Sequence, residues 1–128
     1  KYQKTEDKND MDNYLYMNGS EIFNFTSKSV PLLVDDNLLK NGVSKDEIDT
    51  FIFHQANTFM LNFLRKKIGI PTEKFVIDML NYGNTVSSTI PLALKNSIKS
   101  KRDMKKIMLV GFGVGYSWGA VCLNMNKG

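Results

Sequence analysis

The stretch IMLVGFGVGYSWGAVCLN, residues 107–124, holds two apolar runs separated by a glycine-rich turn. The runs, from Ile107 to Phe112 and from about Ser117 to Asn124, have the composition of strands. Too few residues separate them for a helical crossover, so we predict an antiparallel hairpin. A glycine loop that binds dinucleotides would be followed by a helix, and here a strand follows, which argues against that function.

Shorter apolar runs and helical patterns alternate upstream of the hairpin. Residues 50–53 and 74–79 have the pattern of short strands, and residues 57–68 and 85–100 that of helices. This alternation predicts an α/β fold with a mostly parallel sheet of about four strands.

An earlier helical pattern begins at Ser20, which we predict as its N-cap, and ends at Asn41-Gly42. Pro31 lies inside it and predicts a kink or a break. The residues from Ser44 to Glu47 form a capping-box pattern, which predicts one short turn.

The domain organisation follows from composition. Residues 1–13 are polar and predict a loop or linker, and residues 14–128 are long enough for one domain with a real core. The chain begins with Lys1 rather than Met, and its predicted sheet follows a helix. We therefore expect a piece of a longer protein, with a first strand upstream.

Acidic and basic side chains are unevenly distributed along the chain. Residues 1–50 carry 6 basic and 10 acidic side chains, 6 − 10 = −4, and residues 51–128 carry 11 and 3, 11 − 3 = +8. The basic half suits nucleic acid, a phosphorylated cofactor or an acidic protein. Its basic residues fall at helix ends and its aromatics in apolar runs, which argues against nucleic acid.

The single cysteine, Cys122, excludes an internal disulfide and fits a reducing cytoplasm. Cys122 and the single histidine, His54, are too few soft ligands for a thiol-based zinc site, and we predict no metal. Cys122 lies mid-strand in an apolar run, as expected of a structural thiol. The sequence has neither a signal-peptide pattern nor an apolar run that could span a membrane.

His54 ends a predicted parallel strand, at the edge where α/β sheets form their sites. Alone it could be structural or catalytic. Asn84 follows the next predicted strand, so the two side chains could converge, although Asn84 could equally be a helix cap. Two N–H donors aimed at one point would stabilise an enolate or oxyanion.

Three motifs together resemble the C-terminal half of β-ketoacyl-[acyl carrier protein] synthase III. They are His54-Gln55-Ala56-Asn57, Tyr82-Gly83-Asn84-Thr85 and Gly111-Phe112-Gly113-Val114-Gly115-Tyr116-Ser117-Trp118-Gly119. The resemblance implies a thiolase-like fold. The chain would be the C-terminal condensing-enzyme domain, residues 14–128, of a five-layered αβαβα enzyme.

The resemblance also implies a function, decarboxylating Claisen condensation of an acyl-CoA with malonyl-carrier protein in cytoplasmic fatty acid biosynthesis. The coenzyme A and phosphopantetheine thioesters are substrates, and no cofactor is bound. The partners would be an acidic acyl carrier protein, the N-terminal half that bears the cysteine nucleophile, and a second subunit in a homodimer, without nucleic acid or membrane. Alone, the chain should be inactive.

The resemblance assigns roles to particular residues. His54 and Asn84 would be catalytic, binding the malonyl carbonyl as its enolate forms. Asn57 would lie near the pantetheine path, and Phe112 and Gly113 would line the acyl pocket.

Two departures from the family pattern concern binding. Phe59 stands where many members have a carrier-binding Arg, although Lys66 and Lys67 keep a basic patch on that helix. Val86-Ser87-Ser88-Thr89 replaces the more usual Ser-Ala-Ala-Ser. A condensing enzyme of secondary metabolism, a hydroxymethylglutaryl-CoA synthase type and a non-catalytic basic binding module remain alternatives.

Overall fold

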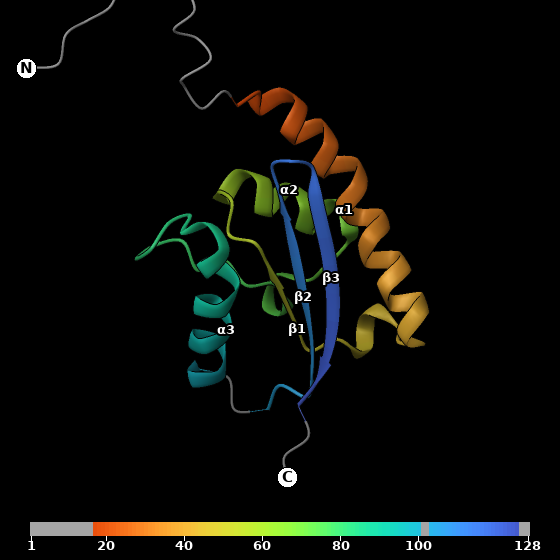
Figure 1. The fold of residues 1–128 in the computed structure, drawn as a ribbon. Helices are drawn as coiled ribbons and strands as arrows, with labels where there is room; N and C mark the ends of the chain where they lie inside the picture. Colours follow the sequence, from red (N-terminus) through yellow and green to blue (C-terminus); the bar gives the residue numbers. More distant parts are fainter. Residues whose placement is uncertain (1–16, 101–102, 126–128) are drawn as a thin grey trace, which may run out of the picture.

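The computed structural model describes residues 17–100 and 103–125, and within them three α-helices pack around a three-stranded sheet (Figure 1). The predicted linker, residues 1–13, lies outside the described residues. The elements are α1 (Gly19–Asn41), η2 (Lys45–Glu47), β1 (Thr50–Phe53), α2 (Thr58–Ile68), η3 (Thr72–Lys74), η4 (Val86–Ser88), α3 (Thr89–Ser100), β2 (Lys106–Gly113) and β3 (Ser117–Asn124). The α/β class is confirmed.

The sheet has the order β1-β2-β3. β1 pairs with β2 in parallel, with Phe53 opposite Val110, and β2 pairs with β3 antiparallel, with Val110 opposite Ala120. The predicted hairpin is therefore confirmed. Its turn contains Gly115 at φ 121°, a backbone conformation that favours glycine.

The predicted strand over residues 74–79 is not formed. Phe75 alone bridges to Phe51, and the Val76 N–H donates to the Phe51 carbonyl at 3.0 Å. Beyond that point the side chain of Gln55 replaces a neighbouring strand, because its Nε2 donates to the Val76 carbonyl at 3.3 Å and its Oε1 accepts from the Asp78 N–H at 2.7 Å. The described sheet thus has three strands rather than about four, with one parallel and one antiparallel pairing.

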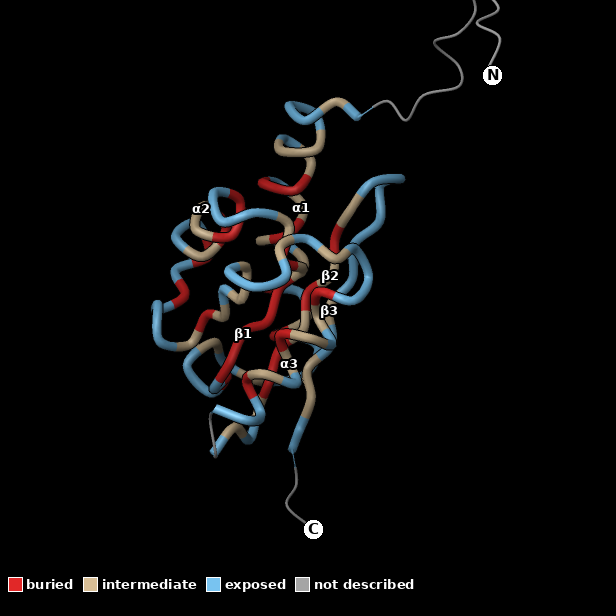
Figure 2. Tube along the Cα trace, turned by 90° about the vertical axis from the view of Figure 1, so that its left-hand side faces the viewer, coloured by how far each residue is buried: buried red, intermediate tan, exposed pale blue. Residues whose placement is uncertain are grey.

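Helices cover both faces of the sheet, and the buried residues concentrate at the strands and the helix faces turned toward them (Figure 2). Phe51, Phe53 and Met108 belong to the larger core, which α1 and α2 complete. Ile52 and Ile107, which point to the opposite face, pack with Ala93 of α3 in a smaller core.

The N-cap of helix α1 lies two residues earlier than predicted. Asn18, not Ser20, is its N-cap, with its side-chain oxygen accepting from the Glu21 N–H at 3.2 Å. The helix continues through Pro31 without a break. Val30 and Val34 are fully buried on either side of the proline, and their burial offsets the one hydrogen bond that proline cannot donate. The predicted C-cap is confirmed, since Gly42 lies at φ 62°.

A side chain of α1 also reaches the outer strand of the sheet. The Val110 carbonyl accepts from the His54 N–H, so the backbone of Val110 faces β1 and that of its partner Ala120 faces outward. Asn37 Nδ2 donates to this Ala120 carbonyl at 3.0 Å. Among residues 17–100 and 103–125, no helix is both long enough and apolar enough to span a membrane.

Candidate active site

The site is built around His54, the residue that follows β1. Its backbone N–H donates to the Val110 carbonyl at 2.8 Å, which extends the parallel pairing by one bond. The imidazole is half-buried, its Nδ1 lies 2.7 Å from Thr89 Oγ1, and the Phe112 ring meets it edge to face at 5.5 Å. Elements from three parts of the chain therefore fix the ring.

Burial lowers the pKa of His54 below its ordinary value, because desolvation disfavours the charged form. The ring is therefore neutral near pH 7, with one nitrogen protonated and the other free to accept. In the part of the chain that the structure describes, no cluster of three His, Cys, Asp or Glu side chains could hold a metal ion. The geometry suits a neutral hydrogen-bonding group.

Asn84 is hydrogen-bonded to the backbone two residues after His54. Its Nδ2 donates to the Ala56 carbonyl at 3.3 Å, and its Oδ1 accepts from the Val86 N–H at 2.9 Å. Asn84 is exposed, and no hydrogen bond between described atoms joins it directly to His54. The structure thus brings the predicted pair to one edge of the sheet.

The turn after Asn84 differs from the predicted helix start. Residues 86–88 form the 3-10 turn η4, and α3 begins only at Thr89. Val86 has φ 57°, a left-handed conformation that is costly for a β-branched residue. Strain is therefore held in the turn that joins Asn84 to Thr89, the residue that contacts His54.

The other predicted residues have separate positions. Asn57 is the N-cap of α2, and its side-chain oxygen accepts from the Met60 N–H at 2.8 Å. Gly113 ends β2, and a Cβ added there would meet no atom within 4 Å. Lys66 and Lys67 are exposed on the last turn of α2, with Lys67 Nζ 5.7 Å from the centre of the Phe63 ring.

Sequence reasoning missed the role of Thr89. In sequence it is only the last residue of the Val-Ser-Ser-Thr segment that departs from the family pattern, yet it is 3% exposed and contacts His54. Gln55 has no assigned role in the sequence motif, yet it is 1% exposed and joins the end of β1 to the Val76–Asp78 segment. No local pattern signals either contact, because the partners are 21 or more residues apart.

Cys122 does not contribute to this site. It is half-buried in β3 opposite Met108, and it packs against the larger core. Its position supports the prediction of a structural thiol.

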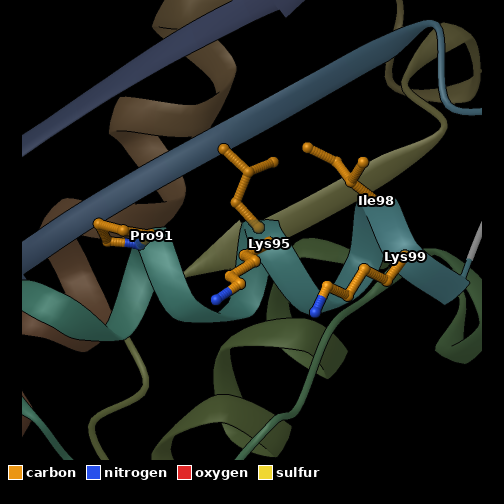
Figure 3. Close-up of a pocket in the computed structure, with 5 residues that line it drawn as sticks. Pro91, Lys95, Ile98 and Lys99 are labelled. Atoms are coloured by element: carbon orange, nitrogen blue, oxygen red, sulfur yellow. The ribbon is translucent and has the colours of Figure 1, made fainter.

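A surface hollow of about 400 Å³ lies on α3 and contains none of the predicted site residues. Its lining residues are Pro91, Leu94, Lys95, Ile98 and Lys99. Figure 3 shows the Lys95 and Lys99 side chains directed to the same side of α3 and Ile98 directed away from them.

Comparisons with known proteins identify the family of the chain. Residues 38–125 match the family model described as 3-Oxoacyl-[acyl-carrier-protein (ACP)] synthase III C terminal. The chain is 41% identical over 117 residues to a β-ketoacyl-[acyl-carrier-protein] synthase III of Clostridium perfringens, covering 89% of the chain and 36% of the relative. A synthase III of Porphyra umbilicalis is 40% identical over 109 residues, covering 84% and 33%.

Solved structures give the same result. A 3-oxoacyl-(acyl-carrier-protein) synthase III is 46% identical with a TM-score of 0.85, covering 89% of this chain and 34% of that one. A synthase III from Thermus thermophilus is 34% identical with a TM-score of 0.84, covering 91% and 37%. A priming β-ketosynthase of the R1128 polyketide pathway is 26% identical with a TM-score of 0.77, covering 85% and 34%. The chain spans about a third of the length of the curated relatives that it matches.

Proposed function

The chain belongs to the family of 3-oxoacyl-[acyl-carrier-protein] synthase III C-terminal domains, and from this membership we propose that it is the C-terminal part of a decarboxylating condensing enzyme. The complete enzyme joins an acyl-CoA to malonyl-carrier protein in cytoplasmic fatty acid biosynthesis. Its partners are the N-terminal half, an acidic carrier protein and a second copy in a homodimer. Residues 14–128 form the domain.

The observation that carries the proposal is the placement of His54. It is a half-buried, neutral imidazole at the carboxyl end of β1, held by Thr89 and Phe112, with Asn84 attached to the carbonyl of Ala56. Two uncharged N–H donors at such an edge suit the stabilisation of a developing oxyanion.

The proposed reaction divides into two steps. In the first, the bond to the malonyl carboxylate breaks, CO₂ leaves, and its electron pair forms the enolate of the thioester. His54 and Asn84 donate hydrogen bonds to the enolate oxygen. In the second, the enolate carbon attacks the acyl thioester held on the cysteine of the N-terminal half, and that thiolate leaves.

The remaining residues support substrate binding in this scheme. Asn57, the N-cap of α2, lies beside the pantetheine path, and Phe112 and Gly113 border the acyl chain. A side chain at Gly113 would occupy space that is otherwise open. Two neutral donors complete the proposed catalytic set without a metal ion.

The alternative functions have less support. Named synthase III proteins of known structure are 30–46% identical to this chain, whereas the polyketide priming enzyme is 26% identical. A function as a non-catalytic basic module would not explain why His54, Thr89 and Asn84 are arranged as they are.

A chimera tests the proposal. The 117-residue match allows this chain to replace the corresponding segment of the Clostridium perfringens relative. In that chimera, His54→Ala or Asn84→Ala should slow malonyl decarboxylation by about 10²–10³-fold, the usual effect of losing one oxyanion donor. Release of CO₂ from malonyl-carrier protein is the measurement.

Acyl transfer to the nucleophile serves as the internal reference, and both variants should retain it. Asn62→Ala is a matched control, since among residues 17–100 and 103–125 Asn62 Nδ2 donates only to the Thr58 carbonyl within α2. Unchanged CO₂ release by the His54→Ala chimera would show that the donor assignment is wrong.

A further inference from the structure

The hydroxyl of Thr89 has one proton and two acceptors within reach. His54 Nδ1 lies 2.7 Å from Thr89 Oγ1, and the Val86 carbonyl oxygen lies 3.1 Å from it. Thr89 is 3% exposed, so water has little access to the hydroxyl. A neutral imidazole carries a single N–H. If the Thr89 hydroxyl donates to Nδ1, the ring proton is on Nε2; if the hydroxyl donates to the Val86 carbonyl, Nδ1 can carry the proton and donate to the hydroxyl.

The two distances favour donation to His54. Hydrogen bonds from a hydroxyl to an oxygen cluster at about 2.7–2.8 Å, so 3.1 Å to Val86 is long. Bonds from a ring or backbone N–H to an oxygen span about 2.7–3.2 Å, so 2.7 Å stands at the short limit for donation by Nδ1. Both departures are explained if the Thr89 proton lies toward the imidazole.

The Val86 carbonyl has another donor. The backbone N–H of Thr89 donates to it where η4 passes into α3. This carbonyl therefore remains paired when the Thr89 hydroxyl turns to His54, whereas Nδ1 has no other donor among the described contacts. Polar groups in half-buried places are normally paired, so the arrangement costs nothing at Val86.

We propose that Thr89 is a positioning residue that donates its hydroxyl proton to His54 Nδ1 and so keeps the ring proton on Nε2. The inference rests on the proposed function, in which His54 is a hydrogen-bond donor to the enolate. With the proton on Nδ1 instead, Nε2 would present a lone pair to the enolate oxygen and repel it. Phe112, packed edge to face on the ring, holds the orientation that this hydrogen bond selects.

Nitrogen-15 NMR tests the proposal directly, because His54 is the only histidine in the chain. The spectrum is recorded on the full chain about two pH units above the ordinary histidine pKa of about 6.5, where the ring is neutral. We expect Nε2 to be the protonated nitrogen, and Nδ1 to show a coupling to the Thr89 hydroxyl proton. A protonated Nδ1 would overturn the inference.

Substitutions separate this hydrogen bond from simple packing. Thr89→Val keeps the side-chain shape and should shift the Nδ1 resonance to higher frequency, as expected for a nitrogen that has lost its donor. Thr89→Ser should restore the original position. Thr85→Val is the matched control, since Thr85 Oγ1 is buried in the same loop without a hydrogen-bond partner, and it should leave the resonance unchanged.

The outcomes can be told apart from failure of the proposed function. An unchanged Nδ1 resonance in Thr89→Val would end the Thr89 inference, while CO₂ release by the His54→Ala chimera would still decide the catalytic role. If Thr89→Val does not fold, the coupling in the unaltered chain and the spectrum of Thr89→Ser decide the question.

Discussion

At the scale of single residues, burial controls the titration of His54. Desolvation lowers its pKa, so the unfolded chain takes up a proton at a higher pH than the folded chain does. Between the lowered pKa and the ordinary value of about 6.5, the unfolded state binds more protons, and the free energy of unfolding falls as pH falls. The stabilising contribution is complete above that range.

This direction can be measured by NMR titration of the single histidine. We expect a pKa below the ordinary value in the folded chain and an ordinary value in denaturant. Phe112→Ala removes part of the cover over the ring and should raise the pKa toward the ordinary value. Phe63→Ala, which affects an aromatic contact with Phe23 on α1, should leave it unchanged. An unchanged pKa in Phe112→Ala would contradict burial as the cause.

The position of His54 could be predicted, because it follows the apolar run of β1 and sites form at the carboxyl edge of a parallel sheet. The expectation for Asn84 rested on a strand over residues 74–79, which is not formed, and its hydrogen bond to the Ala56 carbonyl holds it instead. The side-chain contacts that hold His54 could not be predicted. Thr89 contacts His54 across 35 residues of chain, and only the folding of η4 and α3 brings its hydroxyl to the ring. A threonine in a polar turn looks the same in sequence whether its hydroxyl faces water or an imidazole.

At the scale of elements, the Gln55 side chain makes hydrogen bonds to the backbone that a neighbouring strand would otherwise make. Its side-chain amide pairs with the Val76 carbonyl and the Asp78 N–H, and its Nε2 also donates to the Phe53 carbonyl at 2.7 Å. Gln55→Met keeps the length of the side chain but removes these bonds. We expect the free energy of unfolding to fall by about 1–3 kcal/mol, since each abandoned buried polar group carries its desolvation penalty.

Urea unfolding of the chain measures this loss. Asn62→Ala is the control, because its one side-chain bond lies within α2 and is not buried. It should change stability by no more than about 0.5 kcal/mol, as is usual for surface positions. Equal stabilities of Gln55→Met and the unaltered chain would show that the Val76–Asp78 segment does not depend on the amide.

The same side chain explains which elements could be predicted. β2 and β3 are long runs whose pairing follows from the short turn between them, and both were predicted nearly to the residue. Residues 74–79 have strand composition, but their pairing with β1 ends at the Val76 N–H. The Val76 carbonyl and the Asp78 N–H bond to the Gln55 side chain instead. α1 passes through Pro31 because buried valines on either side stabilise it, which a local rule does not weigh.

At the scale of the whole molecule, basic side chains are concentrated beyond residue 50. The exposed Lys66 and Lys67 at the end of α2 are the proposed contact for an acidic carrier protein. In the chimera, replacing both with Gln should raise the KM for malonyl-carrier protein about fivefold without changing kcat. The estimate follows from about 0.2–1 kcal/mol for each exposed ion pair. The salt dependence of KM should also weaken.

Lys95 and Lys99 offer a control of equal charge on α3, where both are exposed and their side chains point to the same side of the helix (Figure 3). Replacing both with Gln removes the same charge from a different face. If this pair raised KM as much as the α2 pair, net charge rather than a docking surface would be responsible.

The contact from Asn37 to the Ala120 carbonyl bears on aggregation. Within the described sheet, β3 pairs only with β2, and its outward carbonyls and amides could template another strand. Asn37 already occupies the acceptor at the middle of that edge, and α1 lies along β3 (Figure 1). An incoming strand would have to displace a hydrogen bond made from within the chain, so the helix that completes the core also interrupts the register that fibril growth requires.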